Sequence, residues 1–382
     1  MAENRNLFRL TRFVLLKLPK LFRFFAKFHS DKKRLLIVKI DAIGDYILFR
    51  NFIEVVKTSE LYKDYQIDLL GNALWKDIAL KYDSAFIHKF IFTSTPVKLY
   101  YQPWRAFKLG WRLFRNNYGV VLNPAYTRNF ITDGLVALTA GKQIIGFEGD
   151  LEGILPKHKA KTDKFYTRKL VLPQNICFEF ERTRFFFESV LGKAVNLGHI
   201  DIPAAKVERK GIVVFPGAGV AKREWGEQNF AELIRLIKQE SNQPVYLAGG
   251  PGEIALGESL EAALPAGSVT NRIGKSSLTG LIDTIAGAAL VIANDTSAIH
   301  IAVATHTPSV CILGGGHFDR FVPYPEYFDH KPFCVYYKME CYYCNWNCIY
   351  KPADDEVYPC IAAVSVDAVW QEVGTMIKGE LR

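Results

Sequence analysis

The sequence predicts an α/β protein built from two doubly wound, Rossmann-like domains with parallel sheets. Short apolar runs typical of buried strands alternate with stretches of helical period, and the alternation is interrupted once before it begins again. At 382 residues the chain is about twice as long as a usual domain. Hydrophobic residues make up 49% of it, which is enough for two cores.

The first domain is expected over residues 34–205. Its strands are predicted at 35–40, 66–70, 86–92, 120–123 and 144–147, and its helices at 46–57, 74–81, 103–116, 130–140 and 178–191. Residues 148–175 break the alternation with Gly, Lys and Pro, so they are interpreted as a mobile loop. Residues 201–210 are the candidate linker.

The second domain is expected over residues 206–382. Its strands are predicted at 212–215, 245–248, 268–269, 290–293 and 309–313, with helices between them, the first at 228–240.

The N-terminal tail, residues 1–33, carries most of the net charge of +9. Residues 1–34 hold ten of the 48 Lys and Arg but only two of the 39 Asp and Glu, so the body is nearly neutral and no nucleic-acid partner is expected. One helical stripe of the tail is basic and the opposite one is apolar. The basic stripe is Arg5, Arg9, Arg12, Lys20, Arg23 and Lys27, and the apolar one is Leu7, Leu10, Val14, Leu18, Leu21, Phe25 and Phe28.

This pattern predicts an amphipathic helix, bent at Pro19, that binds an anionic membrane surface through residues 5–28. No apolar run reaches the roughly 20 residues of a spanning helix, and charges interrupt any signal-peptide core. The alternatives are a helix docked on the protein body and an Arg-rich targeting segment.

Three apolar strands end in loops that suit the binding of an anion. Residues 34–48 are predicted to form a strand, a loop with Gly44 and Asp45, and a helix. Residues 211–225 are predicted to form a strand and a Gly-rich loop, followed by a basic pair and a Trp. Residues 289–302 are predicted to form a strand, the turn Asn294–Ser297 and a helix. The last helix, capped by Thr296 or Ser297, would direct its first N–H groups at a phosphate, and Asp295 would accept hydrogen bonds from sugar hydroxyls. An ordinary capped turn is the alternative.

Together, and in this order, these segments resemble glycosyltransferase family 9, the heptosyltransferase family of lipopolysaccharide assembly. The resemblance covers roughly residues 34–315. The matching positions are Gly44-Asp45, Pro216-Gly217-Ala218-Gly219, Lys222 and Arg223 before Trp225, Leu247-Ala248-Gly249-Gly250-Pro251, and Asn294-Asp295-Thr296-Ser297 with His300 and Ala302. There are two departures, since Ser297 replaces the family's usual Gly and Gly226 replaces the Pro that follows the Trp.

The resemblance implies the GT-B architecture, two Rossmann-like domains that face one another across a cleft, with the acceptor on the N-terminal side and the nucleotide sugar on the C-terminal side. It also implies an inverting, metal-independent transfer of heptose or a related sugar, with no cofactor required for catalysis. The implied donor is a nucleotide sugar, preferably ADP-linked, and the acceptor is a lipopolysaccharide-type or other membrane glycolipid. The tail would hold such an enzyme on the cytoplasmic face of the membrane.

Such a transfer needs a base for the acceptor hydroxyl and positive groups for the departing diphosphate. Asp45 is the predicted base, with Asp41 as the fallback, and a helix-capping role is the alternative. Lys222 and Arg223 are predicted to bind the diphosphate, unless they are a solvated pair. The wider predicted binding set is Gly44, Gly217, Ala218, Gly219, Trp225, Gly249, Glu253, Asp295, Thr296, Ser297 and His300, the last expected to be packed rather than to act as a base.

Five of the seven cysteines cluster in residues 334–360. Cys341-x-x-Cys344 followed by Cys348 is a candidate structural zinc site, with Cys360 or Cys334 as the fourth ligand. Free or redox-labile thiols are the alternative, and disulfides are disfavoured because a secretion signal is absent.

Two other functions compete with glycosyl transfer. A nucleotide-sugar-modifying or NAD enzyme would carry a G-x-G-x-x-G turn, which the first strand lacks. A catalytically altered family member could instead be a membrane-tethered interaction protein with its Cys cluster, but Asp45 together with an intact anion loop argues against that.

Overall fold

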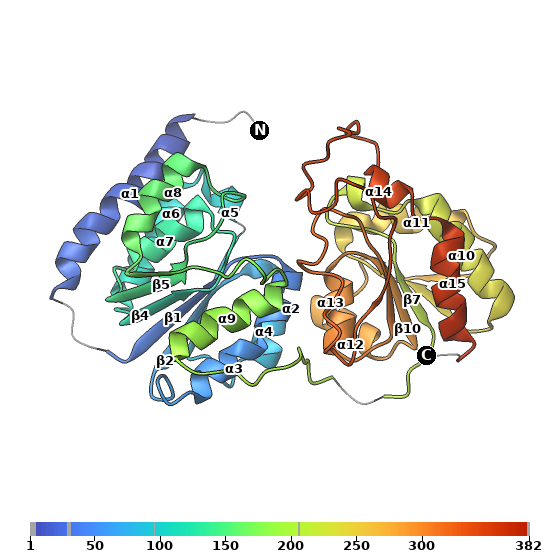
Figure 1. Ribbon diagram of the computed structural model, residues 1–382, viewed down its shortest axis with the longest axis horizontal. Helices are drawn as coiled ribbons and strands as arrows, with labels where there is room; N and C mark the ends of the chain where they lie inside the picture. The colour runs from blue at the N-terminus through green and yellow to red at the C-terminus, as the bar shows by residue number, and fades with distance from the viewer. Residues whose placement is uncertain (1–4, 29–31, 95, 205–206, 380–382) are drawn as a thin grey trace. The chain divides into compact units, whose positions relative to one another are not determined.

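The computed structural model describes residues 5–28, 32–94, 96–204 and 207–379, and the chain divides into two compact units (Figure 1). Unit 1 is Met1–Leu197 and unit 2 is Gly198–Arg382. The boundary expected at 205/206 lies outside the described residues. The segment just before it belongs to unit 2, where the Ile202 N–H donates to the Ala304 carbonyl at 2.8 Å.

Unit 1 is a six-stranded parallel sheet in the order β3-β2-β1-β4-β5-β6. Its strands are β1 (Arg34–Lys39), β2 (Gln66–Asn72), β3 (Lys89–Thr93), β4 (Val120–Asn123), β5 (Gln143–Phe147) and β6 (Arg168–Leu170). Its helices are α1 (Arg5–Ala26), α2 (Ile43–Phe49), α3 (Asn51–Thr58), α4 (Lys76–Tyr82), α5 (Pro96–Leu99), α6 (Pro103–Arg115), α7 (Phe130–Leu138), α8 (Pro156–Thr162) and α9 (Glu179–Leu191). Helices α1, α6, α7 and α8 cover one face of the sheet, and α2, α3, α4 and α9 cover the other (Figure 1). Because both faces are covered, the middle of the central strand β1 is apolar, and Leu35 to Val38 are fully buried.

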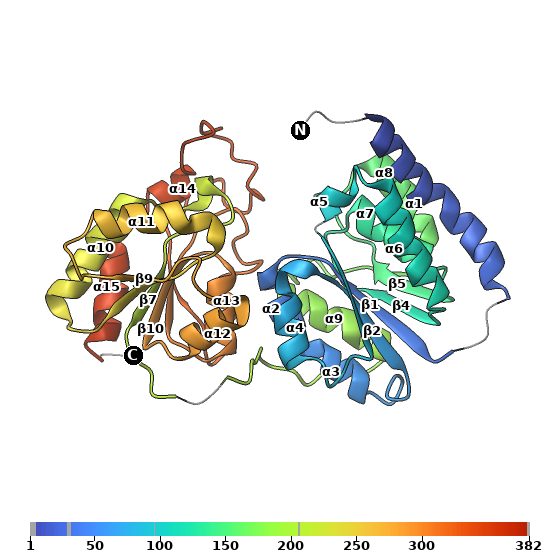
Figure 2. The ribbon, with the colours of Figure 1, turned by 180° about the vertical axis from the view of Figure 1, so that it is seen from behind.

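Unit 2 repeats this topology with the order β12-β11-β10-β7-β8-β9. Its strands are β7 (Ile212–Phe215), β8 (Val245–Leu247), β9 (Thr270–Asn271), β10 (Leu290–Asn294), β11 (Ser309–Ile312) and β12 (Phe333–Val335). Its helices are α10 (Glu227–Glu240), α11 (Ile254–Ala262), α12 (Leu278–Ala286), α13 (Ser297–Ala304), α14 (Pro359–Ala362) and α15 (Val366–Ile377). Helices α12 and α13 lie on one face, and α10 and α15 on the other (Figure 2). The predicted α/β class, with parallel sheets in two Rossmann-like domains, is confirmed.

The prediction of a mobile loop at 148–175 is wrong, because this segment forms α8, a 3-10 helix η2 (Asp163–Phe165) and the edge strand β6. The buried Arg128 holds it in place. Its guanidinium binds Asp133 at 2.6 Å and Asp163 at 2.8 Å, and the Tyr166 hydroxyl donates to Asp133 at 2.7 Å. The lysine-rich helix is therefore fixed by a buried ionic network rather than by an apolar stripe of its own.

The N-terminal helix α1 packs on α6 and α7, which is the docked alternative to a separate tail. Val14, Leu15 and Phe22 are buried there, and a Cβ atom at Gly134 of α7 would lie 2.6 Å from the Leu15 Cβ. Pro19 lies inside the helix, which runs uninterrupted from Arg5 to Ala26. Most of the apolar stripe predicted from the sequence remains exposed, so the buried face is not the one that the simple pattern indicated.

Candidate functional site

In each unit the strand order reverses at one point, between β1 and β4 in unit 1 and between β7 and β10 in unit 2. Ligands of doubly wound sheets bind outside the carboxyl ends of the strands at this switch point. The three segments singled out in the sequence leave β1, β7 and β10 there. Each unit by itself therefore presents its predicted motif where this fold binds ligands.

Asp45 lies in the first turn of α2, not in the loop before it, because the helix begins at Ile43. The N-cap residue is Ala42, and no side chain in the described part of the chain makes a cap hydrogen bond, so Asp45 does not cap this helix. Asp45 and Gly44 are partly buried. A carboxylate in the first turn of a helix is stabilised by the helix dipole.

A buried lysine, Lys39 at the end of β1, sits among the carboxylates of this turn. Its Nζ is 2.8 Å from the Asp41 carboxylate. Burial alone would lower the pKa of Lys39, but the negative charges of Asp41, Asp45 and Glu179 outweigh it and raise that pKa. Lys39 and Glu179 were not predicted as site residues. The signal that could have found Lys39 is a charged residue at the end of an apolar strand.

The loop between β1 and α2 is held from the side of β2. The Asn72 amide donates to the Ile40 and Asp41 carbonyls at 3.1 and 3.2 Å, and the Trp75 indole donates to the Asp41 carbonyl at 3.1 Å. Trp75 stacks on Tyr46 of α2 with ring centroids 3.8 Å apart. These contacts fix the backbone that carries the predicted base.

In unit 2, Asn294 at the end of β10 clamps the loop that follows β7. Its amide donates to the Pro216 and Gly217 carbonyls at 2.8 and 3.1 Å, and its oxygen accepts from the Trp225 N–H at 3.1 Å. Trp225 is buried, and its indole donates to the Val364 carbonyl at 2.7 Å. Trp225, predicted as a binding residue, is thus a core residue that anchors the loop.

The Glu253 carboxylate closes the space between two predicted glycines. A Cβ atom at Gly217 or at Gly249 would lie 2.2 Å from a Glu253 oxygen, so both positions require glycine while this carboxylate is in place. Glu253 also accepts from the Gly250 N–H at 2.7 Å. Burial raises the pKa of Glu253, against a smaller lowering by that hydrogen bond.

A second carboxylate, Glu224, was not predicted. It accepts from the Ala218 N–H at 3.3 Å, and burial raises its pKa. Ala218 is one of the predicted binding residues, and in this structure its amide is already engaged by Glu224.

Helix α13 begins at Ser297, directly after Asp295 and the N-cap residue Thr296. The predicted cap by the Thr296 or Ser297 hydroxyl is not formed, since no side chain of the described residues makes that hydrogen bond. A helix start without a side-chain cap offers its N–H groups and its positive dipole end to an anion.

Arg223, in the 3-10 helix η3 (Ala221–Arg223), is the cation that interacts with Asp295. Burial raises the pKa of Asp295 to about 6, and the Arg223 guanidinium opposes that rise. This guanidinium lies 4.2 Å from the centroid of the Trp346 ring, and its buried Nε has no hydrogen-bond partner among the described residues. Arg223 is thus positioned, with unused donor capacity, in the loop beside Asp295.

The neighbouring Lys222 is engaged elsewhere. Its Nζ donates to the Pro352 carbonyl at 3.0 Å and lies 3.2 Å from the exposed Asp354 carboxylate. The two adjacent cations therefore contact different groups, and the sequence alone did not distinguish their roles.

His300 of α13 is buried, and its Nδ1 lies 2.7 Å from the Tyr324 hydroxyl. Burial lowers the pKa of His300 to about 4, so the ring is neutral at neutral pH. This placement agrees with the expectation of a packed histidine.

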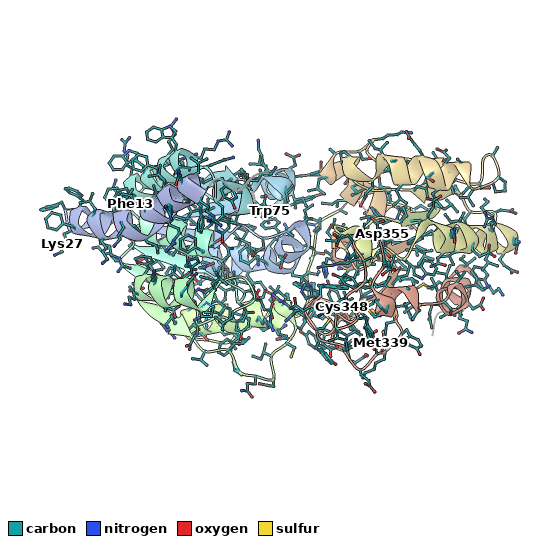
Figure 3. All side chains as sticks on the ribbon, turned by 90° about the horizontal axis from the view of Figure 1, so that it is seen from above. Phe13, Lys27, Trp75, Met339, Cys348 and Asp355 are labelled. Atoms are coloured by element: carbon teal, nitrogen blue, oxygen red, sulfur yellow. The ribbon has the colours of Figure 1, made fainter. Side chains whose placement is uncertain are left out.

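Of the five clustered cysteines, Cys334 lies in β12 and Cys360 in α14, and Cys341, Cys344 and Cys348 lie in the segment between them (Cys348 is labelled in Figure 3). Burial and then the neighbouring Cys344 and Cys348 thiols raise the pKa of Cys341. Within the described ranges, no group of three or more His, Cys, Asp or Glu is arranged to hold a metal ion, and Cys360 accepts a hydrogen bond from the Gly315 N–H at 3.4 Å. The thiols as placed do not make a ligand set, and zinc binding by Cys341, Cys344, Cys348 and Cys360 stays a prediction.

Two comparisons of the sequence point to one family. The family model described as glycosyltransferase family 9 (heptosyltransferase) matches residues 106–330. Over 112 residues the chain is 33% identical to lipooligosaccharide heptosyltransferase 2 of Haemophilus influenzae. That alignment covers 28% of this chain and 32% of the relative, so the chain matches about a third of the relative's length.

Solved structures agree with the observed fold. The E. coli ADP-heptose LPS heptosyltransferase II gives a TM-score of 0.66 at 17% identity, with 91% of this chain and 99% of that chain covered. E. coli heptosyltransferase WaaC, solved with ADP-2-deoxy-2-fluoro heptose, gives 0.65 at 19% identity, with 89% and 99% covered. These likenesses confirm the predicted GT-B class. Since the family model spans more than half of the chain and takes in the loops after both β7 and β10, the chain belongs to glycosyltransferase family 9.

Proposed function

We propose that the protein transfers heptose or a related sugar from an ADP-linked donor to a lipopolysaccharide-type membrane glycolipid. The observation that carries this proposal is the uncapped start of α13 beside Asp295 and Arg223, at the switch point of unit 2. The names of the similar proteins support the substrate class, since one acts on lipooligosaccharide and another was solved with an ADP-heptose analogue.

In this proposal the diphosphate of the donor lies at the start of α13 and is neutralised by the helix dipole and Arg223. Asp295 accepts hydrogen bonds from donor hydroxyls, and it is largely ionised at neutral pH because its pKa is about 6. With a fixed guanidinium and a helix start at the leaving group, the transfer proceeds without a metal ion.

The chemical step proposed is a single displacement. The acceptor hydroxyl oxygen forms a bond to the anomeric carbon, the bond from that carbon to the diphosphate oxygen breaks, and ADP leaves with the electron pair. The hydroxyl proton passes to Asp45. One displacement inverts the configuration at the anomeric carbon, which is the inverting outcome.

Ligand binding and ADP release test this function. Among ADP, GDP, UDP and CDP, we expect ADP to stabilise the full-length protein most in thermal melts, by about 2.7 kcal/mol at 100 times its dissociation constant. We also expect ADP release from ADP-heptose to depend on an added lipopolysaccharide-type glycolipid. Preferential stabilisation by another nucleotide would contradict the donor, and ADP release unaffected by the glycolipid would contradict the acceptor.

We further propose that the enzyme works as a peripheral protein on the cytoplasmic face of the membrane. The α1 ridge, defined as Leu10, Phe13, Leu21, Phe24, Phe25 and Phe28, is about half exposed or more at each position, up to 78% at Phe28. Phe13 is labelled on α1 in Figure 3, together with Lys27 just past its end. The adjoining helix α6 exposes Trp104 and Trp111, residues of the kind that favour a membrane interface. Among the described residues no helix is both long and apolar enough to cross a membrane.

The α1 ridge predicts the result of a vesicle experiment. Phe24→Ser with Phe28→Ser should weaken binding to phosphatidylglycerol vesicles about 100-fold or more, because each buried Phe contributes roughly 1.5–3 kcal/mol. The loss should persist at high salt, since burial of apolar surface is not screened. Co-sedimentation measures it.

The matched control is Leu61→Ser with Val171→Ser, which removes two exposed apolar side chains elsewhere on unit 1 and should leave binding unchanged. Point variants are preferable to removal of α1, since that would uncover the core that Leu15 and Phe22 fill. Equal binding by wild type and the double Phe variant would contradict the membrane role of the ridge.

A further inference from the structure

A pocket of about 450 Å³ lies between α1 and the α8–η2 segment of unit 1, elements that run side by side in Figures 1 and 2. Six cationic side chains line it, namely Arg9, Arg12, Lys17, Lys20, Lys161 and Lys164. The remaining lining is apolar and consists of Phe13, Leu16 and Phe165. Neither the fold nor the proposed transfer reaction requires this combination.

The positive charge of the pocket is not neutralised by its own walls. No carboxylate is among the described residues that line it. Asp163, which lies between the two lining lysines of this segment, is engaged by Arg128 at 2.8 Å, Lys159 at 3.1 Å and Lys169 at 3.3 Å. A ligand with negative charge would therefore meet cations that have no competing acid in the pocket.

Arg12 in the lining and His158, which interacts electrostatically with Arg12 and Lys161, are two polar groups that bear on this charge. The buried Nε of Arg12 has no hydrogen-bond partner within the described ranges. Next to it, burial and the charges of Arg12, Lys157 and Lys161 lower the pKa of His158. Among the described residues the Arg12 Nε is thus a donor that a ligand could use, and the cations near His158 add to the burial that disfavours its protonation.

The walls of the pocket are fixed in advance. Arg23 of α1 donates to the Phe165 carbonyl and, at 3.5 Å, to the Lys164 carbonyl, which joins α1 to η2. Leu15 of the same helix packs against Gly134 of α7. A ligand would enter a site that is already formed, as most small-molecule sites are.

We propose that this pocket binds the phosphate head group of a membrane lipid that carries a phosphate monoester. This inference rests on the membrane association proposed above. Arginine and lysine together suit phosphate, because the guanidinium binds it in a bidentate manner and the ammonium acts as a point charge. A monoester carries about −1.5 to −2 charges at neutral pH, which fits six cations better than the single charge of a diester.

The apolar part of the lining selects a lipid over a free phosphate. Phe13, Leu16 and Phe165 give the first carbons of the acyl chains a surface to contact. Phe13 also belongs to the α1 ridge, so the pocket opens next to the side chains proposed to enter the membrane. A lipid can therefore reach the pocket without leaving the bilayer, and its binding would fix the orientation of unit 1 at the surface.

The test compares vesicles of phosphatidylcholine that contain phosphatidic acid, a monoester, with vesicles of equal surface charge that contain phosphatidylglycerol, a diester. The full-length protein should bind the phosphatidic acid vesicles more tightly. Lys161→Ala with Lys164→Ala should weaken that binding by about 100-fold or more, since each direct hydrogen bond to the charged monoester contributes about 1.5–3 kcal/mol. Binding to phosphatidylglycerol vesicles should change much less, because the α1 ridge is intact.

Lys193→Ala with Lys210→Ala is the charge-matched control, since both lysines are exposed and lie outside the pocket. It should keep the preference for phosphatidic acid. Equal binding of the two vesicle types by wild type, or an unchanged preference in the Lys161/Lys164 variant, would overturn the proposal. All of these lysines are exposed, and thermal melts verify that the variants fold.

A membrane-free arm separates this proposal from the membrane association itself. Calorimetry with soluble dihexanoyl phosphatidic acid should show binding to wild type and loss in the Lys161/Lys164 variant, with glycerol 3-phosphate binding much more weakly. If the two ligands bind equally, the pocket is a phosphate site and not a lipid site. If wild type binds the short-chain lipid but no vesicle, the proposed membrane association is contradicted, while the pocket remains a binding site for a lipid phosphate.

Discussion

Asp45→Asn is expected to lower the turnover of glycosyl transfer by about 10² to 10⁴ while leaving ADP binding nearly unchanged. Asparagine keeps the size of the side chain but cannot accept the proton of the acceptor hydroxyl. The position is defined, because Asp45 lies in the first turn of α2 near the buried Lys39, and the adjoining loop is fixed by Asn72 and Trp75. Steady-state kinetics and calorimetry with ADP measure the two effects.

Asp41→Asn is the control for this prediction. Asp41 shares Lys39 with Asp45 and binds it directly at 2.8 Å, so its loss should disturb the charge balance of the turn without removing the base. The expected decrease is smaller than for Asp45→Asn. Full activity of the Asp45 variant, or a larger loss in the Asp41 variant, would transfer the role of the base to another group.

Arg223→Ala is expected to weaken ADP binding by about 10- to 100-fold and adenosine binding very little, because a hydrogen bond to a charged group contributes about 1.5–3 kcal/mol. The guanidinium interacts with Asp295, which immediately precedes the start of α13, and its Nε has spare donor capacity among the described residues. The effect should shrink as salt rises, since part of the interaction is screened. Calorimetry with both ligands over a salt series checks it.

Lys222→Ala is the matched control, because it removes the same charge one residue away. Its Nζ already binds Pro352 and Asp354, so its removal should affect ADP binding much less. Equal losses of ADP and adenosine affinity in the Arg223 variant would place the guanidinium elsewhere. A stronger effect of Lys222→Ala would reverse the assignment of the two cations.

The strands and the loops at their ends could be predicted because their signals are local. The strands β1 and β10 are buried on both faces and therefore read as mainly apolar runs, and each predicted strand end lies within one residue of the observed one. Where such a run stops at Gly44-Asp45 or at Asp295, the change of composition marks the carboxyl end of the strand. In a doubly wound sheet that edge is also where ligands bind, so a local pattern indicated the site.

The segment from α8 to β6 shows where local signals fail. Its lysines give no apolar period, yet it is ordered because Asp163 meets the buried Arg128 from a distant part of unit 1. The face that α1 buries was missed for a related reason. The face of α1 that becomes buried is set by Gly134 of α7, whose missing side chain leaves room for Leu15. The helical pattern of α1 alone carries no information about α7.

By itself, the sequence determined the two Rossmann-like domains, the three loops and the family. Burial on both faces of a sheet and the turn residues at its edge depend on residues that are neighbours in the sequence, so a local pattern indicates them. Only the tertiary structure decided which of two adjacent cations keeps an unused donor among the described residues. Lys222 and Arg223 have the same charge and the same local context, but Lys222 finds its partner 130 residues away at Pro352, and Arg223 meets the Trp346 ring instead. Contacts between residues so far apart depend on how the chain packs, and no local pattern records them.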